Sequence, residues 1–89
     1  MATHDLKIWP EFFQAVLEDR KRFEYRNDDR GFKVGDVLLL REWTPYTENY
    51  TGRKEEVKVT YILKDRMQLG TMCIMSIEKV DRTEEDARP

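Results

Sequence analysis

The chain has 89 residues, enough for one domain, and 38% of them are charged, with a net charge of −2 at pH 7. This near-neutral balance excludes a protein that coats DNA by general electrostatic attraction. The single cysteine, Cys73, excludes an intramolecular disulfide, and with one histidine it cannot form an ordinary zinc site. We find no bilayer-spanning apolar run and no secretion signal, and therefore expect a cytoplasmic protein without a metal or cofactor.

The N-terminal part of the sequence predicts a strand and then a short helix. Apolar and polar residues alternate over residues 3–8, as in a strand. Pro10 suits the first turn of a helix, and the apolar residues around it recur every three or four positions, which predicts two turns ending near Asp19. Glycine would suit a left-handed helix end better than this aspartate. We expect the core to include Trp9, Phe12, Phe13 and Phe23.

The rest of the chain predicts four more strands. Residues 20–26 alternate, and residues 36–43 are apolar on both faces, which predicts a central strand covered on each side. A polar loop at 44–52 precedes a strand at 54–63 whose side chains Val57, Val59, Tyr61 and Leu63 are expected to point the same way. The last strand is expected at 71–80, with buried positions at Met72, Ile74, Met75 and Ile77.

This order of elements predicts an α+β domain that is mainly β. We expect residues 1–80 to form a small five-stranded β-barrel with one short helix plugging an end. A sheet of this length tends to curl, because closure removes exposed strand edges. Residues 81–89 hold four acidic side chains and no large apolar one, and are expected to form a disordered acidic tail.

One charged segment stands out, D-R-K-R-F-E-Y-R at residues 19–26. It resembles the G-x-K-x-x-E-x-R signature of the ASCH domain, a PUA-related β-barrel associated with RNA. Lys21, Glu24 and Arg26 match this signature, and Asp19 replaces its glycine. Other segments, such as V-G-D at 34–36, L-R-E-W at 40–43 and V-T-Y-I-L at 59–63, are similar to small ASCH-related proteins of bacteria and phages. The resemblance implies a PUA-like fold and a function with RNA or a nucleotide.

The spacing of the three matching residues predicts a charged cluster. Glu24 and Arg26 share a face of one strand, about 6.5–7 Å apart along it. Lys21 has the opposite parity and can join them only from the turn before the strand. Such a cluster suits a phosphate or a base edge, and Glu24 could accept a hydrogen bond from an exocyclic amino group. The alternative is a structural ion-pair cluster, although exposed pairs add only about 0–1 kcal/mol.

Aromatic side chains near the predicted hairpin allow two interpretations. Trp43, Tyr46 and Tyr50 either stack on a base or pack the hairpin onto the barrel. Arg41 shares a strand face with Trp43. Tyr61 either adds its hydroxyl to the cleft or belongs to the core.

Three functions follow from these observations. The first is binding of RNA or a modified nucleotide in a charged cleft by Lys21, Glu24 and Arg26, with support from Arg20, Arg30, Arg41 and Tyr61. The second is a hydrolase acting on a modified nucleoside or on RNA, since some ASCH proteins hydrolyse acylated cytidine and others are linked to RNA cleavage. The type that hydrolyses acylated cytidine has a threonine at the position of Glu24. In this chain Glu24 would instead activate water while Lys21 stabilises negative charge. The third is a protein-interaction module that uses the hairpin at 44–53 or the acidic tail.

Overall fold

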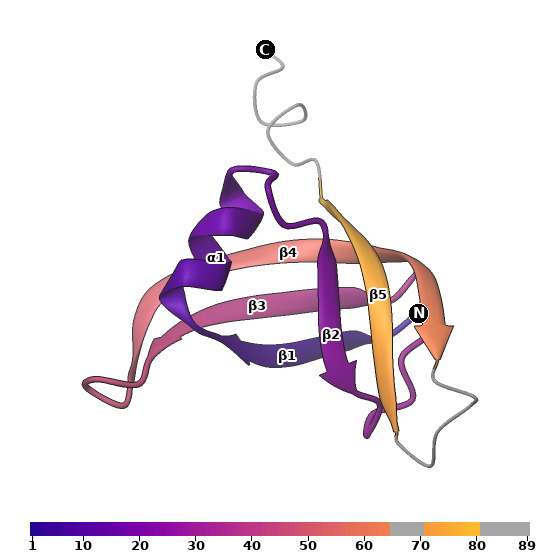
Figure 1. Cartoon of the computed structure of the whole chain (residues 1–89), viewed down its shortest axis with the longest axis horizontal. Coiled ribbons are helices and arrows are strands. Elements are labelled where there is room, and N and C mark those ends of the chain that lie inside the picture. Colours follow the sequence, from indigo (N-terminus) through magenta and orange to yellow (C-terminus); the bar gives the residue numbers. More distant parts are fainter. Residues whose placement is uncertain (65–70, 81–89) are drawn as a thin grey trace.

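The computed structural model describes residues 1–64 and 71–80. Its elements follow the predicted order (Figure 1): β1 (Thr3–Ile8), α1 (Pro10–Leu17), β2 (Phe23–Asn27), β3 (Val37–Thr44), β4 (Asn49–Lys64) and β5 (Met72–Lys79). The prediction of a mainly β domain with five strands and one short helix is therefore confirmed. The predicted tail at 81–89 lies outside the described residues. In the part of the chain that the structure describes, no helix has the length and apolarity needed to cross a membrane.

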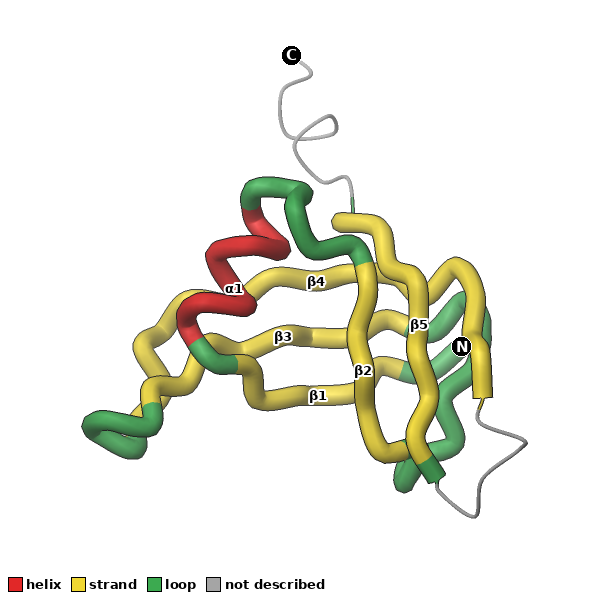
Figure 2. Tube along the Cα trace, viewed as in Figure 1, coloured by secondary structure: helices red, strands yellow, loops and turns green. Residues whose placement is uncertain are grey.

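The five strands form one sheet in the order β1-β3-β4-β5-β2. β1 runs parallel to β3, and the other neighbours are antiparallel. The sheet curls into a half-barrel, so that β2 and β5 run across the direction of β1 and β3 (Figure 1). Figure 2 shows α1 above one end of this curled sheet, where it contacts β3. Within the described residues β1 and β2 do not pair with each other, and they form the two edges.

Two arginines span the opening between these edges. Arg26 of β2 donates from Nη2 to the carbonyl of Lys7 at 3.0 Å. Arg30, just after β2, donates from Nη1 to the carbonyl of Asp5 at 2.9 Å. Both acceptors lie on β1, the edge strand. Side-chain donors thus cover carbonyls that an open sheet edge would leave to solvent or to another chain.

The aromatic core prediction is confirmed for Phe13 and wrong for three other rings. The buried face of α1 consists of Phe13, Ala15 and Val16. Trp9, Phe12 and Phe23 are 46%, 45% and 48% exposed. The two-turn helix presents a narrow buried stripe, and its first residues lie at the opening of the half-barrel. Phe23 points outward because β2 turns its charged face, with Glu24, toward the interior.

β3 and β5 bury every second residue. Leu38 and Leu40 of β3 are fully buried, whereas Leu39 is only half-buried, so the expected cover on both faces of this strand is wrong. Its central place between β1 and β4 is confirmed. In β5 the inner face carries Cys73, Met75 and Ile77. Ile74 is 41% exposed, so its predicted burial is wrong, because strand alternation places it on the opposite face.

β4 is longer than predicted and contains a bulge. It begins at Asn49, so a turn at 45–48 replaces most of the expected loop. Val59 pairs with Ile77 and Tyr61 pairs with Ser76, which leaves one extra residue on β4. Beyond the bulge Tyr61 and Leu63 are exposed, and Ile62 packs against the core. The expected common direction of Tyr61 and Leu63 with the two buried valines is therefore wrong.

Candidate functional site

A left-handed turn after α1 directs Lys21 toward β2. Asp19 adopts a φ of 60°, and its N–H donates to the carbonyl of Val16 at 3.1 Å. The N–H groups of Arg20 and Lys21 both donate to the carbonyl of Ala15, at 2.9 and 3.1 Å. This is the Schellman arrangement, which satisfies the last helix carbonyls and reverses the chain. Lys21 therefore joins the strand face of Glu24 from the turn before β2, as the sequence predicts.

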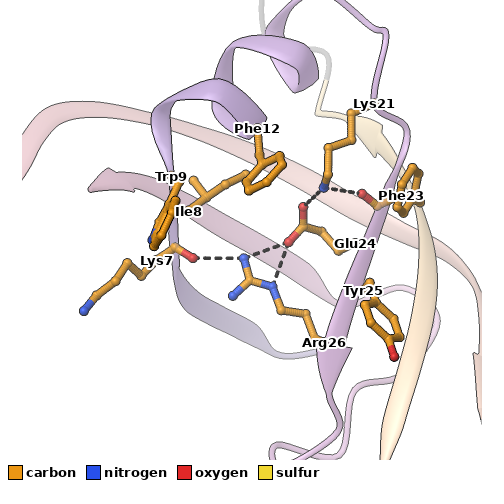
Figure 3. A pocket seen from close by; sticks show the side chains of 9 residues that line it. All are labelled: Lys7, Ile8, Trp9, Phe12, Lys21, Phe23, Glu24, Tyr25 and Arg26. Atoms are coloured by element: carbon orange, nitrogen blue, oxygen red, sulfur yellow. Dashed lines mark hydrogen bonds and ion pairs between the residues drawn. The ribbon is translucent and has the colours of Figure 1, made fainter. Parts of the chain in front are cut away.

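Glu24 lies at the centre of the charged cluster and is only 2% exposed (Figure 3). Lys21 Nζ donates to its Oε2 and, at 2.6 Å, to the carbonyl of Phe23. Arg26 Nε donates to Glu24 Oε1 at 2.7 Å, and Nη2 lies 2.7 Å from the same oxygen. Each carboxylate oxygen thus contacts a cation. The buried carboxylate fixes the positions of both cations.

A pocket of about 530 Å³ opens beside the cluster, between β2 and the junction of β1 with α1. The rings of Trp9 and Phe12 lie on the side opposite β2 (Figure 3). Lys21 and Arg26 keep 17% and 25% of their side-chain surface exposed, so both cations remain accessible. The pocket is lined by Lys7, Ile8, Trp9, Phe12, Lys21, Phe23, Glu24, Tyr25 and Arg26.

The cluster retains hydrogen-bond donors for a ligand. Among the described residues, none accepts a hydrogen bond from Nη1 of Arg26. Lys21 Nζ has three N–H groups and two described acceptors. The three side chains carry one more positive than negative charge. This arrangement suits a ligand group that is anionic or rich in acceptors, such as a phosphate or a base carbonyl.

The aromatic lining is the part of the site that sequence reasoning missed. Trp9, Phe12 and Phe23 were expected in the core, and Tyr25 was not considered for the site. For Phe23 and Tyr25 the signal was the parity of β2, since an inward Glu24 requires outward neighbours on the same strand. The rings of Phe23 and Tyr25 lie on the other side of β2 from Glu24 (Figure 3). Lys21 Nζ is 4.9 Å from the centroid of the Phe23 ring.

Four other candidate residues do not line the pocket. Arg20 is exposed and donates to Glu18 at 2.7 Å. Arg30 donates to the β1 edge, as described above. Arg41 lies on the outer face of β3, with its Cζ 3.9 Å from the centroid of the Tyr50 ring. Tyr61 is 65% exposed on the outer face of β4. The structure thus brings together Lys21, Glu24 and Arg26 and leaves these four outside.

Metal-ligating side chains do not gather at the pocket. Over residues 1–64 and 71–80 no group of three His, Cys, Asp or Glu side chains could hold a metal ion. His4 Nε2 lies 2.8 Å from Asp36 Oδ2. Cys73 is buried in the core, where desolvation raises the pKa of its thiol. Among the described residues, the pocket presents the partly exposed cations Lys21 and Arg26 beside aromatic rings.

Comparison with known proteins places the chain in a family. A family model described as "Domain of unknown function (DUF3850)" matches residues 3–77, which include the helix and nearly all of the sheet. A similar protein is the "Uncharacterized 12.9 kDa protein in GpA 3'region" of Escherichia phage P2, which is 42% identical over 57 residues. The match covers 64% of this chain and 50% of that protein, so the chain spans about half of its relative's length. The phage relative agrees with the predicted likeness to small bacterial and phage proteins. Because the family model covers most of its length, the chain belongs to the DUF3850 family.

Proposed function

We propose that the chain binds RNA or a nucleotide in the pocket between α1 and β2. The observation that carries this proposal is the place of Lys21 and Arg26, which are held by a buried carboxylate at the wall of an open, ring-lined hollow. The volume of about 530 Å³ lies within the range of about 300–1,000 Å³ typical of small-ligand pockets. Cations and aromatic faces together match the phosphate and the base of a nucleotide.

The two cations supply the polar part of recognition. Glu24 accepts hydrogen bonds from both cations and thereby orients them. Their remaining N–H groups donate to the ligand. A hydrogen bond to a charged group contributes roughly 1.5–3 kcal/mol, so each cation is worth about a tenfold to hundredfold change in affinity. Glu24 itself positions these donors, because both of its oxygens accept from a cation and its side chain is buried rather than presented to an exocyclic amino group.

The exposed rings supply the apolar part. Trp9 and Phe12 lie across the pocket from the cluster (Figure 3). Large exposed rings at the wall of a pocket are costly to leave in water, and a base that stacks on one removes that cost. Stacking of a base on an aromatic side chain contributes about 1–3 kcal/mol.

The ASCH and PUA-like assignment is part of the same proposal. Its support is the signature residues Lys21, Glu24 and Arg26, which act here as one cluster. The left-handed conformation of Asp19 is one that glycine adopts most easily, and glycine is the residue that the signature has at this position. The half-barrel with a single helix is compatible with the assignment.

The hydrolase alternative requires Glu24 to act as a general base, and its contacts do not favour that role. A general base needs an oxygen within hydrogen-bond reach of the attacking water. Both oxygens of Glu24 already accept from cations, and the side chain is buried. Binding without turnover is therefore the function that we favour.

Titration of nucleoside monophosphates and short single-stranded RNA, followed by fluorescence, tests the proposal. Trp9 serves as the reporter in a Trp43→Phe background, since the chain has only two tryptophans. We expect Lys21→Ala and Arg26→Ala each to weaken binding by about 10- to 100-fold at low salt. Phe12→Ala should weaken it less, because one stacking surface remains.

The matched control is Arg20→Ala, which removes a cation from the same segment but outside the pocket. Its affinity should equal that of the unmodified chain. Equal affinities for the Lys21, Arg26 and Arg20 variants, or no binding at low salt, would refute the proposal. Product formation that is abolished in Glu24→Gln would favour the hydrolase instead.

A further inference from the structure

Three cations lie side by side on the outer face of the sheet. Lys7 of β1 pairs in register with Arg41 of β3, and Arg41 pairs with Lys54 of β4. Lys7 and Arg41 point away from the core, because their neighbours along the strand are buried. Lys54 is exposed and pairs with Arg41, so its side chain lies on the same outer face. Like charges directly opposite each other destabilise a sheet. This basic row, Lys7, Arg41 and Lys54, therefore costs stability unless an anion offsets it.

Among the residues that the structure describes, the ion pair of Arg41 with Asp5 offsets this charge only in part. Asp5 Oδ2 lies 3.5 Å from Arg41 Nη1, which balances one of the three charges. The other partners are rings. Lys7 Nζ is 4.1 Å from the centroid of the Trp43 ring, and Arg41 Cζ is 3.9 Å from that of Tyr50. The basic row thus lies next to a pair of aromatic residues, since Trp43 and Tyr50 pair with each other just beyond the register shift that follows Arg41.

The basic row adjoins the pocket through Lys7. The carbonyl of this residue accepts from Arg26 at the pocket wall. Its side chain extends away from the pocket (Figure 3), and its ammonium lies over the Trp43 ring. A bound polymer that extends out of the pocket on this side therefore contacts cations and aromatic rings in alternation. Proteins that bind single-stranded nucleic acid use this combination, with cations for phosphates and rings for bases.

We propose that the ligand is a single-stranded nucleic acid of several nucleotides rather than a free nucleotide. One base occupies the pocket, and the adjoining phosphates lie along the basic row. The neighbouring bases stack on the exposed ring of Tyr50 or on the guanidinium plane of Arg41. This inference rests on the proposed function and extends it. Charge complementarity alone would also accept an acidic peptide, but the interleaved rings favour a polyanion that carries bases.

Fluorescence anisotropy with a labelled RNA oligonucleotide, its DNA counterpart and a labelled mononucleotide tests this inference. We expect either oligonucleotide to bind more tightly than the mononucleotide. The affinities for the RNA and the DNA oligonucleotide should differ only slightly. Arg41→Gln and Lys54→Gln should each weaken oligonucleotide binding several-fold. Each should also reduce the slope of log affinity against log salt by about 0.7, the contribution of one phosphate contact on a single strand. Mononucleotide affinity should not change.

Lys58→Gln is the matched control, because Lys58 is an exposed lysine on the same strand outside the basic row. Its oligonucleotide affinity should equal that of the unmodified chain. Two results would overturn the inference while pocket binding stands. One is an equal loss of oligonucleotide affinity in Lys54→Gln and Lys58→Gln, and the other is equal affinity for the mononucleotide and the oligonucleotide. If Lys21→Ala changes nothing but Lys54→Gln weakens the oligonucleotide, the pocket proposal fails and the basic row remains a binding surface. Competition by polyglutamate equal to that by RNA would overturn the nucleic-acid assignment.

Discussion

Asp19 is a residue held in a conformation that glycine adopts more easily. Its φ of 60° completes the turn that directs Lys21 into the pocket. A non-glycine residue in this region costs about 1–2 kcal/mol, somewhat less for aspartate. The Asp19 side chain offsets little of this cost, since its ion pair with Lys79 is exposed and spans 3.5 Å.

We therefore expect Asp19→Gly to be at least as stable as the unmodified chain. Asp19→Ala should be less stable than Asp19→Gly by about 1 kcal/mol, because the Cβ of alanine is penalised in the left-handed region and glycine has none. Urea denaturation of the three proteins measures these differences. Equal stability of the alanine and glycine variants would mean that the turn does not impose the left-handed conformation in solution.

Glu42 of β3 is another buried carboxylate, and it pairs in register with Ile8 of β1. It accepts hydrogen bonds from Arg53 Nε and Nη2, both at 2.9 Å, and from Thr51 Oγ1 at 2.6 Å. The hydrogen bonds from Arg53 hold the pKa of Glu42 below its ordinary value. A depressed carboxyl pKa stabilises the folded state above the unfolded pKa of about 4.3, and this contribution is lost as the pH falls through the folded pKa.

Folding stability should therefore fall as the pH drops from about 5 into the acid range, in part through Glu42. Glu42→Gln should lower stability at neutral pH and make the acid side of the stability profile less steep. Thermal melting across this pH range checks the expectation. The control is Glu55→Gln, because Glu55 lies on the neighbouring strand β4 and its carboxylate contacts no cation among the described residues, so its variant should keep the original slope. An unchanged slope in Glu42→Gln would contradict the assignment.

At the scale of an element, the bulge in β4 determines which side chains face the core. Strict alternation from Val59 places Leu63 inside and Ile62 outside, but the extra residue reverses this order. Ile62→Ala should lower the free energy of unfolding by about 1–2 kcal/mol, because the side chain packs against the core while staying partly exposed. Leu63→Ala, at the neighbouring exposed position, should change it by less than about 0.5 kcal/mol.

Chemical denaturation of both variants distinguishes the two arrangements. A larger loss in Leu63→Ala than in Ile62→Ala would mean that β4 continues in register with no bulge.

Local patterns in the sequence predicted most elements, because the signals for them lie within a few residues. Alternation gave the bounds of β1, and Pro10 gave the start of α1. The meeting of Lys21 with Glu24 and Arg26 followed from strand parity and the turn before β2. These are all relations over fewer than ten residues, which the chain carries locally.

Other features depended on contacts between distant segments. Alternation shows which residues of β2 share a face, but only the packing against β1 and α1 selects the charged face as the inner one. Nothing in the residues around Thr60 marks a bulge. The basic row exists only because β1 pairs in parallel with β3, in a register that joins Lys7 to Arg41. These long-range choices are the part that sequence patterns did not determine.

At the scale of the whole molecule, the curled sheet has two outer faces of different chemistry. The face of β1, β3 and β4 carries the basic row and its rings. The face of β2, β5 and the end of β4 is apolar, because register aligns Tyr25 with Ile74 and Ile74 with Leu63. Phe23 and Tyr61 lie in the next row, on either side of Ser76. All five apolar side chains are exposed, and a contiguous exposed patch of this kind favours association.

We expect the unmodified chain to self-associate at high concentration through this apolar face, and Ile74→Lys to reduce that association. Ile74 lies at the centre of the face and its side chain is exposed, so the substitution should alter folding stability by less than about 1 kcal/mol. Met75→Lys is the contrasting variant on the same strand. Met75 is fully buried, and an unpaired ammonium there should unfold the domain. Sedimentation velocity over a concentration series, with circular dichroism to check folding, separates the two effects. An Ile74→Lys protein that is folded but associates as strongly as the unmodified chain would show that another surface mediates the contact.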